Sequence, residues 1–517
     1  MKKRKFLFLL LVAGMTVVLV VSPVIAGEQY TVFGNPLNLT GYITQGLAFS
    51  LSDKDRYDTE KGLQSALMNL FLEMDYKISP QLKFYTSERL SVDWIYQLNH
   101  NDDSWHDKLF NKSKGHLNVD DKYWQILNEA HFTWTPGNFF FFRVGKQIVS
   151  WGEMDGFRLM DQINPLDSRR GFADVEFENT IIPIWLIRME FYPRITTKWL
   201  QDSALEFVFN PNADFIPNQD IAVGNDAGGI WSPNVVFPDP TAPFGEVRYG
   251  SYITDLNEPK NFNHKGYEYA FRVKALVKDT IVTLNGFYGL DNSPILKFKD
   301  PLNPYPLITT AYDGRLLLHP SVEGHFPRFK FIGATASRDL PFLAYTPIGG
   351  VAPVVRLETW YGFNNTFTDY IKFVKSDEFR MALGVDWKIK IPFLNPKAYF
   401  SISPQVYYRC IFDRPHNEEW FDAAGARVTK HNWITSLYIS TAYFNSKLVP
   451  SLYWMHDFET NSEYFRLQVT YDWKTSWRFT IGSMLFAAEK LPDFKEGNGF
   501  SAFDHKDQIY FKVSYKW

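Results

Sequence analysis

Cysteine is nearly absent from this chain of 517 residues, in which Cys410 is the only example. A single cysteine cannot form an internal disulfide, and attached c-type haem is excluded because it needs a C-x-x-C-H motif. Cys410 stands at the end of an apolar segment, so we expect a buried or lipid-facing residue without a chemical role. Beyond Ala26 no apolar run reaches the length of about 20 residues that a membrane helix needs, which excludes helical spans.

The sequence also lacks the motifs of the common enzyme classes, namely H-E-x-x-H, G-x-S-x-G, the phosphate-binding loop and the dinucleotide fingerprint. No grouping of serine, histidine and carboxylate stands out, so we expect no enzymatic activity, no cofactor and no metal site. The formal net charge is -3, which gives no argument for a nucleic-acid partner.

What is present begins with the features of a secretory signal. Residues 2–5 are all basic, residues 6–21 are apolar, and the segment ends in the V-x-A pattern of residues 24–26. A permanent membrane helix is the alternative, but the apolar run is shorter than about 20 residues and no stop-transfer flank follows. We therefore predict a signal peptide at 1–26, cleavage before Gly27 and export from the cytoplasm.

Aromatic residues make up 17% of the chain, although its mean hydropathy is only -0.24. A transmembrane β-barrel explains both values. Its strands alternate lipid-facing apolar residues with lumen-facing polar ones, so the average hydropathy cancels, while aromatic residues collect at the two membrane interfaces.

Alternation with period two recurs along the chain and is clearest at its end, where only Tyr510 interrupts the polar positions. The apolar positions of this last segment are Ile509, Phe511, Val513, Tyr515 and Trp517. The same pattern runs through 465–473 and 379–389. Successive side chains of a strand point to opposite faces, so one face here meets lipid and the other meets water. A soluble β-sandwich also alternates, but the aromatic content and the secretory signal favour a membrane barrel.

The terminal segment resembles the assembly signal of bacterial outer-membrane barrels, which is a final alternating strand with an aromatic C-terminus. Trp517 is that residue here. The resemblance implies that the barrel-assembly machinery recognises Trp517. It also implies that the mature chain lies in the bacterial outer membrane, in contact with lipid and lipopolysaccharide.

Strand-like segments number eighteen, which predicts an all-β fold: one antiparallel transmembrane barrel over 27–517, with sixteen strands as the alternative count. The segments are 37–51, 65–78, 82–94, 123–135, 139–150, 180–193, 203–210, 266–278, 280–290, 328–340, 354–365, 377–391, 398–411, 432–447, 450–459, 462–475, 477–489 and 507–517. Long connections alternate with short ones such as 79–81, as expected for external loops and periplasmic turns. Wall side chains cannot fill so wide a barrel, so we expect a water channel narrowed by loops.

A distinctive block of residues opens the third external loop, directly after the segment 139–150. Its members are Trp151, Gly152, Glu153, Ile163, Asn164, Pro165 and Asp167. The block resembles the W-G-E…I-N-P block of a proteobacterial outer-membrane β-barrel (porin-like) family of unassigned function, and the resemblance implies no substrate. In general porins the third loop folds into the lumen, so we interpret 151–179 as a candidate constriction.

Within 151–179, seven acidic residues outnumber three basic ones. The candidate constriction residues are Glu153, Asp155, Arg158, Asp161, Asp167, Arg169 and Arg170. Opposing charges across a narrow lumen would sort permeants by charge, and the surplus of carboxylates would favour cations. Two alternatives are an external loop with solvated charges and an Arg–Glu network that braces the wall. Candidate lumen-facing residues on the polar faces of their strands are Arg272, Lys274, Arg380, Arg466 and Asp472.

The sequence leaves several functions open. The first is a porin-like channel for passive diffusion of small polar solutes or ions. The second is a barrel scaffold that sheaths or docks a periplasmic partner, for example an electron-transfer cytochrome or an export component. A transporter of hydrophobic compounds would need an apolar lumen, whereas the inward positions assigned above are charged or small. No feature supports a trimer, and 211–265 is long enough to form a lid or a partner surface.

Overall fold

The first and last long strands of the chain pair with each other and close an antiparallel barrel. In the computed structural model, β2 (Asn35–Ser50) pairs with β29 (Gln508–Lys516) along one edge and with β4 (Leu67–Lys77) along the other. The structure describes residues 29–52, 61–98, 117–170, 177–193, 195, 197–219, 236–238, 246–249, 253–310, 314–344, 351–423, 425–488 and 499–517. The predicted signal peptide, residues 1–26, lies outside them.

The barrel has eighteen strands, which is the larger of the two counts expected from the sequence. In the order in which they pair around the ring, the strands are β2, β4, β5 (Leu82–Asp93), β6 (Leu127–Trp134), β7 (Phe140–Gln147), β8 (Ile184–Phe191), β9 (Leu200–Asn210), β13 (Glu268–Val277), β14 (Thr280–Leu290), β19 (Arg328–Asp339), β20 (Val354–Thr368), β21 (Phe373–Ile389), β22 (Phe400–Ile411), β25 (His431–Ser440), β26 (Leu448–Asp457), β27 (Ser462–Trp473), β28 (Trp477–Ala488) and β29. Every pairing is antiparallel, which confirms the predicted fold class.

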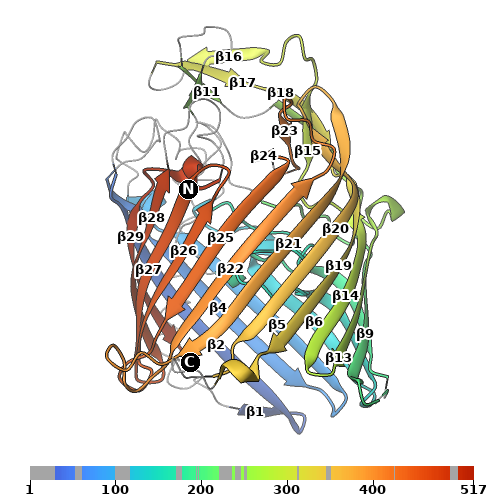
Figure 1. Ribbon diagram of the computed structural model, residues 1–517, viewed down its shortest axis with the longest axis vertical. Helices are drawn as coiled ribbons and strands as arrows, with labels where there is room; N and C mark the ends of the chain where they lie inside the picture. Colours follow the sequence, from blue (N-terminus) through green and yellow to red (C-terminus); the bar gives the residue numbers. More distant parts are fainter. Residues whose placement is uncertain are drawn as a thin grey trace.

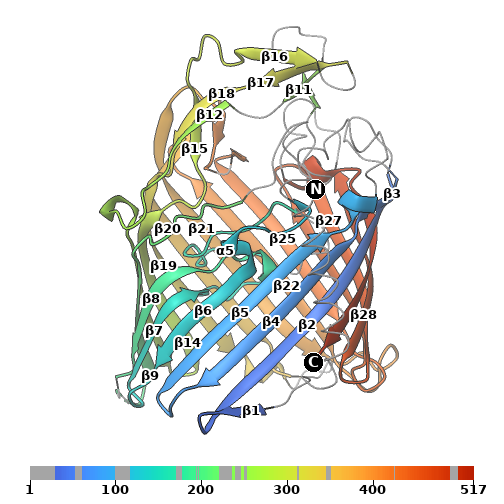
Figure 2. The ribbon, with the colours of Figure 1, turned by 180° about the vertical axis from the view of Figure 1, so that it is seen from behind.

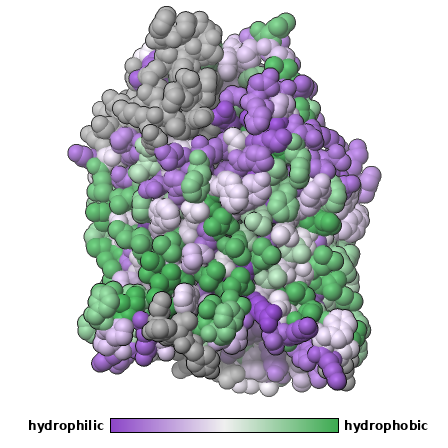
Figure 3. Space-filling model, in the orientation of Figure 1, coloured by the Kyte–Doolittle hydropathy of each residue, from purple (hydrophilic) through white to green (hydrophobic). Residues whose placement is uncertain are grey.

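Alternation along each strand places apolar side chains on the outer surface. On β27, for example, Leu467, Val469 and Trp473 are exposed outside, whereas Arg466 and Gln468 take the opposite, inward face. Figure 3 shows the result as a belt of hydrophobic residues over the strands, with hydrophilic residues gathered above it. This distribution is the one that a barrel wall in contact with lipid requires.

Tyr510, which interrupts the alternation of the last strand, is an inward residue. Its side chain is fully buried, and its hydroxyl donates a hydrogen bond to Gln468 at 2.9 Å. The alternation of inward and outward side chains along β29 is therefore continuous, and the Tyr510 ring packs in the interior and not on the lipid face.

Short and long connections lie at opposite ends of the barrel, which we call the turn end and the loop end (Figure 1). At the turn end, Lys278 and Lys474 adopt positive φ angles of 53° and 57° in tight links between strands. At the loop end, the connections 148–183, 211–267 and 291–327 are long. The predicted alternation of connection lengths holds for most of the ring, with the short links 369–372 and 458–461 at the loop end and the long turn 340–353 as exceptions.

Two small sheets lie beyond the loop end, and Figure 1 shows β16 and β17 above the barrel. The first sheet contains β10 (Val236–Pro238), β11 (Glu246–Tyr249), β17 (Leu316–His319) and β16 (Leu307–Thr310), and the second contains β12 (Ile253–Asn257), β18 (Ser321–His325) and β15 (Ile295–Phe298). The remaining elements are β1 (Gln29–Val32), β3 (Gly62–Ser65), β23 (Trp420–Phe421), β24 (Arg427–Val428), α2 (Ile95–Leu98), α5 (Tyr123–Ile126), η2 (Phe177–Thr180), η3 (His264–Gly266), η4 (Pro341–Leu343) and η6 (Gly499–Phe503). In the described part of the chain, no helix is long and apolar enough to cross a membrane.

Several expected strand boundaries are wrong by three residues or more, and two of them show the physical reason. The strand expected at 123–135 begins only at Leu127, because α5 precedes it and the Gln125 side chain accepts the N–H groups that start this helical turn. The strand expected at 432–447 ends at Ser440, because residues 444–446 all have positive φ angles, which a strand cannot accommodate. Cys410 is buried in β22 as a free thiol, as expected.

The barrel wall is not equally high on all sides. Strands β6, β7 and β8 contain only 8 residues each, whereas β20 contains 15 and β21 contains 17. Figure 2 shows the short strands in front, with the strands of the far wall visible above them. The connection that follows β7 therefore leaves the wall well below the rim of the long strands.

Candidate functional site

The connection from β7 to β8 folds into the barrel over its described residues, 148–170 and 177–183, and we call these residues the crossing loop. Trp151, Leu159 and Met160 belong to this loop and are buried almost completely. They pack in one apolar cluster with inward-facing wall residues from β8 round to β26. These wall residues are Ile184, Leu186, Val208, Ala270, Phe287, Phe329, Phe331, Trp360, Ala382, Tyr407, Ile434 and Met455. The crossing loop is thus held inside the barrel by burial of apolar surface.

The tip of the crossing loop reaches the far wall. A Cβ atom built at Gly156 would lie 2.4 Å from the Tyr453 hydroxyl on β26, which stands nearly opposite β7 in the ring. Further along the wall, a Cβ at Gly333 of β19 would lie 2.5 Å from Met160 Cε. The glycine at 333 therefore leaves room for the loop, and the loop spans the lumen from one side to the other.

Two polar side chains of the loop shape its entry into the lumen. The buried Asn164 amide accepts a hydrogen bond from Val149 N–H at 2.8 Å and donates to the carbonyl groups of Gln147 and Ile182 at 3.1 and 3.0 Å. Asp161 Oδ1 accepts the N–H groups of Trp151 and Gly152. Because these bonds satisfy backbone groups that have no strand partner, they stabilise a folded rather than an extended loop.

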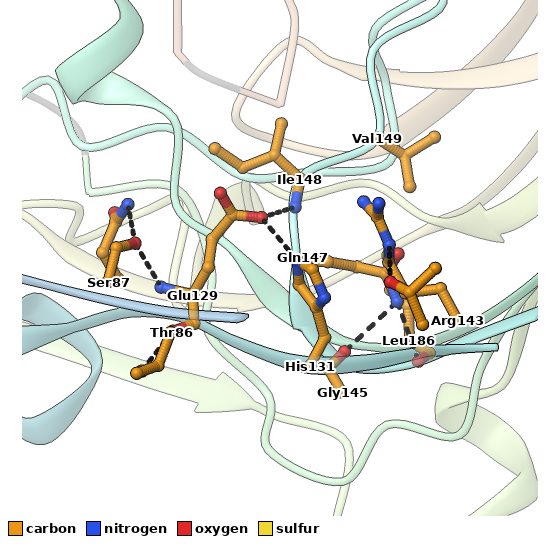
Figure 4. A network of polar contacts seen from close by, with 12 residues as sticks. Thr86, Ser87, Glu129, His131, Arg143, Gly145, Gln147, Ile148, Val149 and Leu186 are labelled. Carbon is orange, nitrogen blue, oxygen red and sulfur yellow. Dashed lines mark hydrogen bonds and ion pairs between the residues drawn. The ribbon is translucent and has the colours of Figure 1, made fainter. Parts of the chain in front are cut away.

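At the root of the loop, side-chain hydrogen bonds hold the backbone at the point where β7 leaves the sheet (Figure 4). Glu129 of β6 accepts the Ile148 N–H at 3.2 Å, and Gln147 donates to the Leu186 carbonyl at 3.1 Å. Gly145 is required here, because its φ is 135° and a Cβ would lie 2.2 Å from the Ala130 carbonyl oxygen. The direction of the loop is thus set before its first apolar residue.

Charged residues of β20 hold the far part of the loop. The fully buried Glu358 carboxylate accepts the N–H groups of Glu153 and Met154. Arg356 donates to Asp155 at 2.9 Å and to Asp386 of β21 at 2.8 Å. Neither Arg356 nor Glu358 was singled out from the sequence, because one carboxylate or guanidinium on a polar strand face looks like any other.

The candidate constriction residues form pairs within the loop and with the wall. Glu153 lies 3.9 Å from the Arg272 guanidinium of β13, and Arg158 donates to the Asn164 carbonyl at 3.2 Å. Asp155 has the Arg356 partner described above, but its side chain stays 70% exposed. Asp161 is the hydrogen-bond acceptor for the loop backbone. Most of these groups therefore form hydrogen bonds or ion pairs that brace the loop.

The remaining candidates lie near the root of the loop. Asp167 accepts two hydrogen bonds from the Arg169 guanidinium at 2.8 and 2.7 Å. Burial raises the pKa of Asp167, but the bonds and charge of Arg169 outweigh burial and hold the pKa below its usual value. Arg170 lies 3.9 Å from Asp93 of β5 and 3.6 Å from Asp120. These charges are paired on the near wall and do not face each other across the lumen.

All five candidate lumen-facing residues lie on the inward face of their strands. Arg380 donates to Glu378 at 2.7 Å and stacks on the Trp360 ring at 4.4 Å. Arg466 lies over the Tyr453 ring at 5.9 Å, close to the loop tip. Arg272 lies beside Glu153, and Lys274 lies opposite Thr283 in the pairing of β13 with β14. Asp472 forms an ion pair with Arg478 at 2.7 Å.

The expectation that inward positions are only charged or small is wrong. Phe287, Phe331 and Trp360 occupy inward positions on three consecutive strands and stack in a row, with ring centroids 5.7 and 5.4 Å apart. Tyr407 of β22 stacks on Phe157 of the loop at 5.3 Å. Alternate residues of a strand point inward, so the sequence pattern could have revealed these rings, but the register of each strand was uncertain from one sequence.

Among the described residues, no group of three or more histidine, cysteine, aspartate or glutamate side chains could hold a metal ion. Two further groups with side chains of the kinds that bind metal ions, the acidic residues of 53–58 and the histidine and aspartate residues of 100–107, lie outside the described residues.

With the barrel and its crossing loop established, comparison with known proteins places the chain in a family. A family model for proteins of unknown function (DUF1302) matches residues 7–517. The chain belongs to the DUF1302 family. No curated protein matches it.

Three solved outer-membrane proteins are similar to this chain at low sequence identity. OpdK from Pseudomonas aeruginosa is 6% identical, with a TM-score of 0.45, 93% of this chain covered and 98% of that one. OccAB3 from Acinetobacter baumannii is 7% identical, with a TM-score of 0.46 and coverage of 93% and 99%. OmpF from Salmonella typhi is 8% identical, with a TM-score of 0.37 and coverage of 95% and 100%.

Proposed function

We propose that this protein is an outer-membrane, porin-like channel through which small polar solutes or ions diffuse passively. The observation that carries the proposal is the crossing loop, which is tied from β7 to Tyr453 inside a closed barrel with an apolar outer belt. A barrel of eighteen strands is wide enough to hold water, and an inward loop narrows it without closing the wall. The predicted signal peptide and the terminal Trp517 support export and outer-membrane assembly.

The packing of the loop supports a constriction rather than a complete plug. Its buried apolar cluster draws wall residues from β8 round to β26. Among the described residues, that cluster includes none from β27, β28, β29, β2, β4, β5 or β6. The inner faces of these strands, which are mostly polar or charged away from the region where η6 packs on them, are therefore the side on which permeants would pass.

The loop also bears on the alternatives. A barrel that sheaths a periplasmic partner needs a lumen free along its axis, whereas the crossing loop spans it. The row of Phe287, Phe331 and Trp360 supports a second candidate, a transporter of hydrophobic compounds, because loop movement would expose these rings. In the structure the rings are covered by the loop, so the channel is the better proposal.

We infer that the W-G-E…I-N-P block is the part of the sequence that forms the crossing loop throughout its family. Support comes from Trp151, whose indole N–H donates to Glu206 of β9 at 3.2 Å, and from Asn164, which bonds three backbone groups. Substituting Asn164 with Leu should therefore release the loop root and increase channel noise without unfolding the barrel.

Single-channel recording of the purified barrel in a planar bilayer tests the channel proposal. We expect open channels in the native protein and a higher conductance when residues 153–162 are replaced by a short Gly-Ser linker. The matched control removes residues 300–309, which lie at the loop end beyond the barrel, and should leave conductance unchanged. Heat-modifiable migration on gels shows that each variant is folded.

Two results would contradict the proposal in different ways. If neither the native barrel nor the loop variant conducts, the protein is not a channel and the scaffold alternative becomes the better one. If the native barrel conducts little but the loop variant binds a hydrophobic fluorescent probe, the transporter of hydrophobic compounds is favoured.

A further inference from the structure

The inner wall of the barrel has two main parts, which differ in whether the apolar cluster of the crossing loop packs on them. The first part, β8 to β26, carries the apolar cluster and the crossing loop. The second part, which we call the uncovered wall because the apolar cluster does not extend over it, consists of β27, β28, β29, β2, β4 and β5. Strands β6 and β7, at the root of the loop, belong to neither part. Towards the loop end, η6 packs on Tyr464, Phe486 and Tyr510 of this wall. The other inward positions of the uncovered wall are mostly polar or charged, with Leu67 and Phe71 of β4 as apolar exceptions.

Charge on the uncovered wall is mainly positive. Its inward-facing basic residues number seven, and its inward-facing acidic residues number four. The basic residues are Lys77, Lys83, Arg89, Arg466, Arg478, Lys512 and Lys516, and the acidic ones are Glu73, Asp75, Asp93 and Asp472.

Pairing within this wall leaves the surplus unchanged, because each ion pair takes up one basic and one acidic residue. Asp75 pairs with Lys83, Asp472 with Arg478 at 2.7 Å, and Asp93 lies 3.9 Å from Arg170 of the crossing loop. On the covered part, by contrast, the arginines are balanced by carboxylates, as in the pairs of Arg356 with Asp155 and Asp386. The uncovered wall therefore carries the positive field of the lumen.

Aromatic rings lie beside two cations of the uncovered wall. Arg466 lies 5.9 Å from the centre of the Tyr453 ring. Near the turn end, Lys83 Nζ lies 6.0 Å from the Tyr85 ring. A cation beside an aromatic face offers an anion a charge for its carboxylate and an apolar surface for its body.

Arg466 stands at the edge of the proposed constriction. Its guanidinium lies over the ring of Tyr453, whose hydroxyl is approached by Gly156 of the loop tip. A solute that passes between the loop tip and β27 would therefore pass Arg466. Asp155, next to Gly156, is held by Arg356 and by Gln405 at 3.3 Å, so its charge is partly compensated.

Resting on the channel function proposed above, we propose that the channel selects small anions, with carboxylates that carry an apolar ring preferred, and that Arg466 is the main specificity-determining residue. The positive field attracts anions and repels cations in the narrow part of the lumen, where bulk water screens least. The rings beside the cations then favour benzoate over acetate, although simple sieving by size would favour acetate.

Reversal potentials of single channels in a KCl gradient test the charge preference. We expect chloride to be at least about threefold more permeant than potassium, and this ratio to fall at least about twofold in Arg466→Gln. Arg338→Gln is the matched control, because Arg338 lies at the turn end beside Asp279 and faces away from the lumen. The control should keep the native ratio. Bi-ionic recordings with benzoate and acetate test the ring preference, and benzoate should be the more permeant.

Each outcome is decisive and is separate from the channel proposal. Conducting channels that prefer potassium, or an Arg466→Gln ratio equal to that of Arg338→Gln, would overturn the inference while leaving the channel in place. Acetate more permeant than benzoate would overturn the preference for aromatic carboxylates. A folded barrel without any conductance would instead contradict the channel function itself.

Discussion

Gly156 and Tyr453 are in direct contact across the barrel, although they are far apart in the sequence. Gly156 has a φ of 87°, and a Cβ at this position would lie 2.4 Å from the Tyr453 hydroxyl oxygen. The loop tip can approach β26 this closely only because the residue has no side chain and tolerates a left-handed conformation. The contact sets how far the crossing loop extends.

Substituting Gly156 with alanine should displace the loop tip. The strained φ and the clash with Tyr453 together cost about 1–3 kcal/mol, which the loop can relieve by moving away from β26. We expect larger or noisier single-channel currents. Adding Tyr453→Phe removes the clashing oxygen and should restore part of the native behaviour. Unchanged currents in Gly156→Ala would show that the tip does not border the pore.

Asp161 should act as a brace for the loop and not as a charge in the pore. Its carboxylate accepts the N–H groups of Trp151 and Gly152, and each such bond to a charged acceptor contributes about 1.5–3 kcal/mol. Asp161→Ala should make the loop more sensitive to proteases in the folded barrel, whereas Asp161→Asn keeps an acceptor and should resemble the native protein. Equal shifts of reversal potential in both variants would favour the pore-charge interpretation.

Trp517 should be needed for efficient assembly. Its backbone exchanges two hydrogen bonds with Gly41 at 3.1 and 3.3 Å, and its ring lies so close that a Cβ at Gly41 would be 2.7 Å from Cζ2. Deleting Trp517 should lower the yield of heat-modifiable barrel in the outer membrane and leave unfolded chain in the periplasm. Trp517→Phe keeps an aromatic end and serves as the control. A normal yield after deletion would make the terminal aromatic incidental.

The loop segment that begins at Asp291 should loosen as pH rises. The pKa of Asp291 is raised to about 6, and burial is the largest cause. Asp422 and Glu378 raise it as well, whereas the Ser293 N–H and Arg380 lower it. The folded loop therefore favours the protonated carboxyl, and this stabilisation is lost as pH rises through about 6. Hydrogen exchange at Ser293, corrected for its intrinsic rate, should be about tenfold more protected near pH 5 than near pH 7.5. Asp291→Asn should abolish the difference, and equal protection in the native protein would contradict it.

Much of the fold can be predicted from the sequence because strand alternation is local. The apolar residues at 509, 511 and 513 already define the lipid face of β29, and long connections define the loop end. The errors occurred where local signals compete. Residues 123–126 are apolar enough for a strand, but the side chain of Gln125 stabilises a helical turn instead.

The sequence by itself therefore determined that this protein is an antiparallel barrel with an apolar outside, since the period of two residues dictates which side chains share a face. It also pointed to the loop after β7. Only the tertiary structure decided what that loop does: its carboxylates at 161 and 167 turn inward on their own loop, and Glu358 and Arg356 of β20 receive its far part. Such partners come from strands far away in the chain, and their meeting depends on the register around the whole ring, which no local pattern encodes.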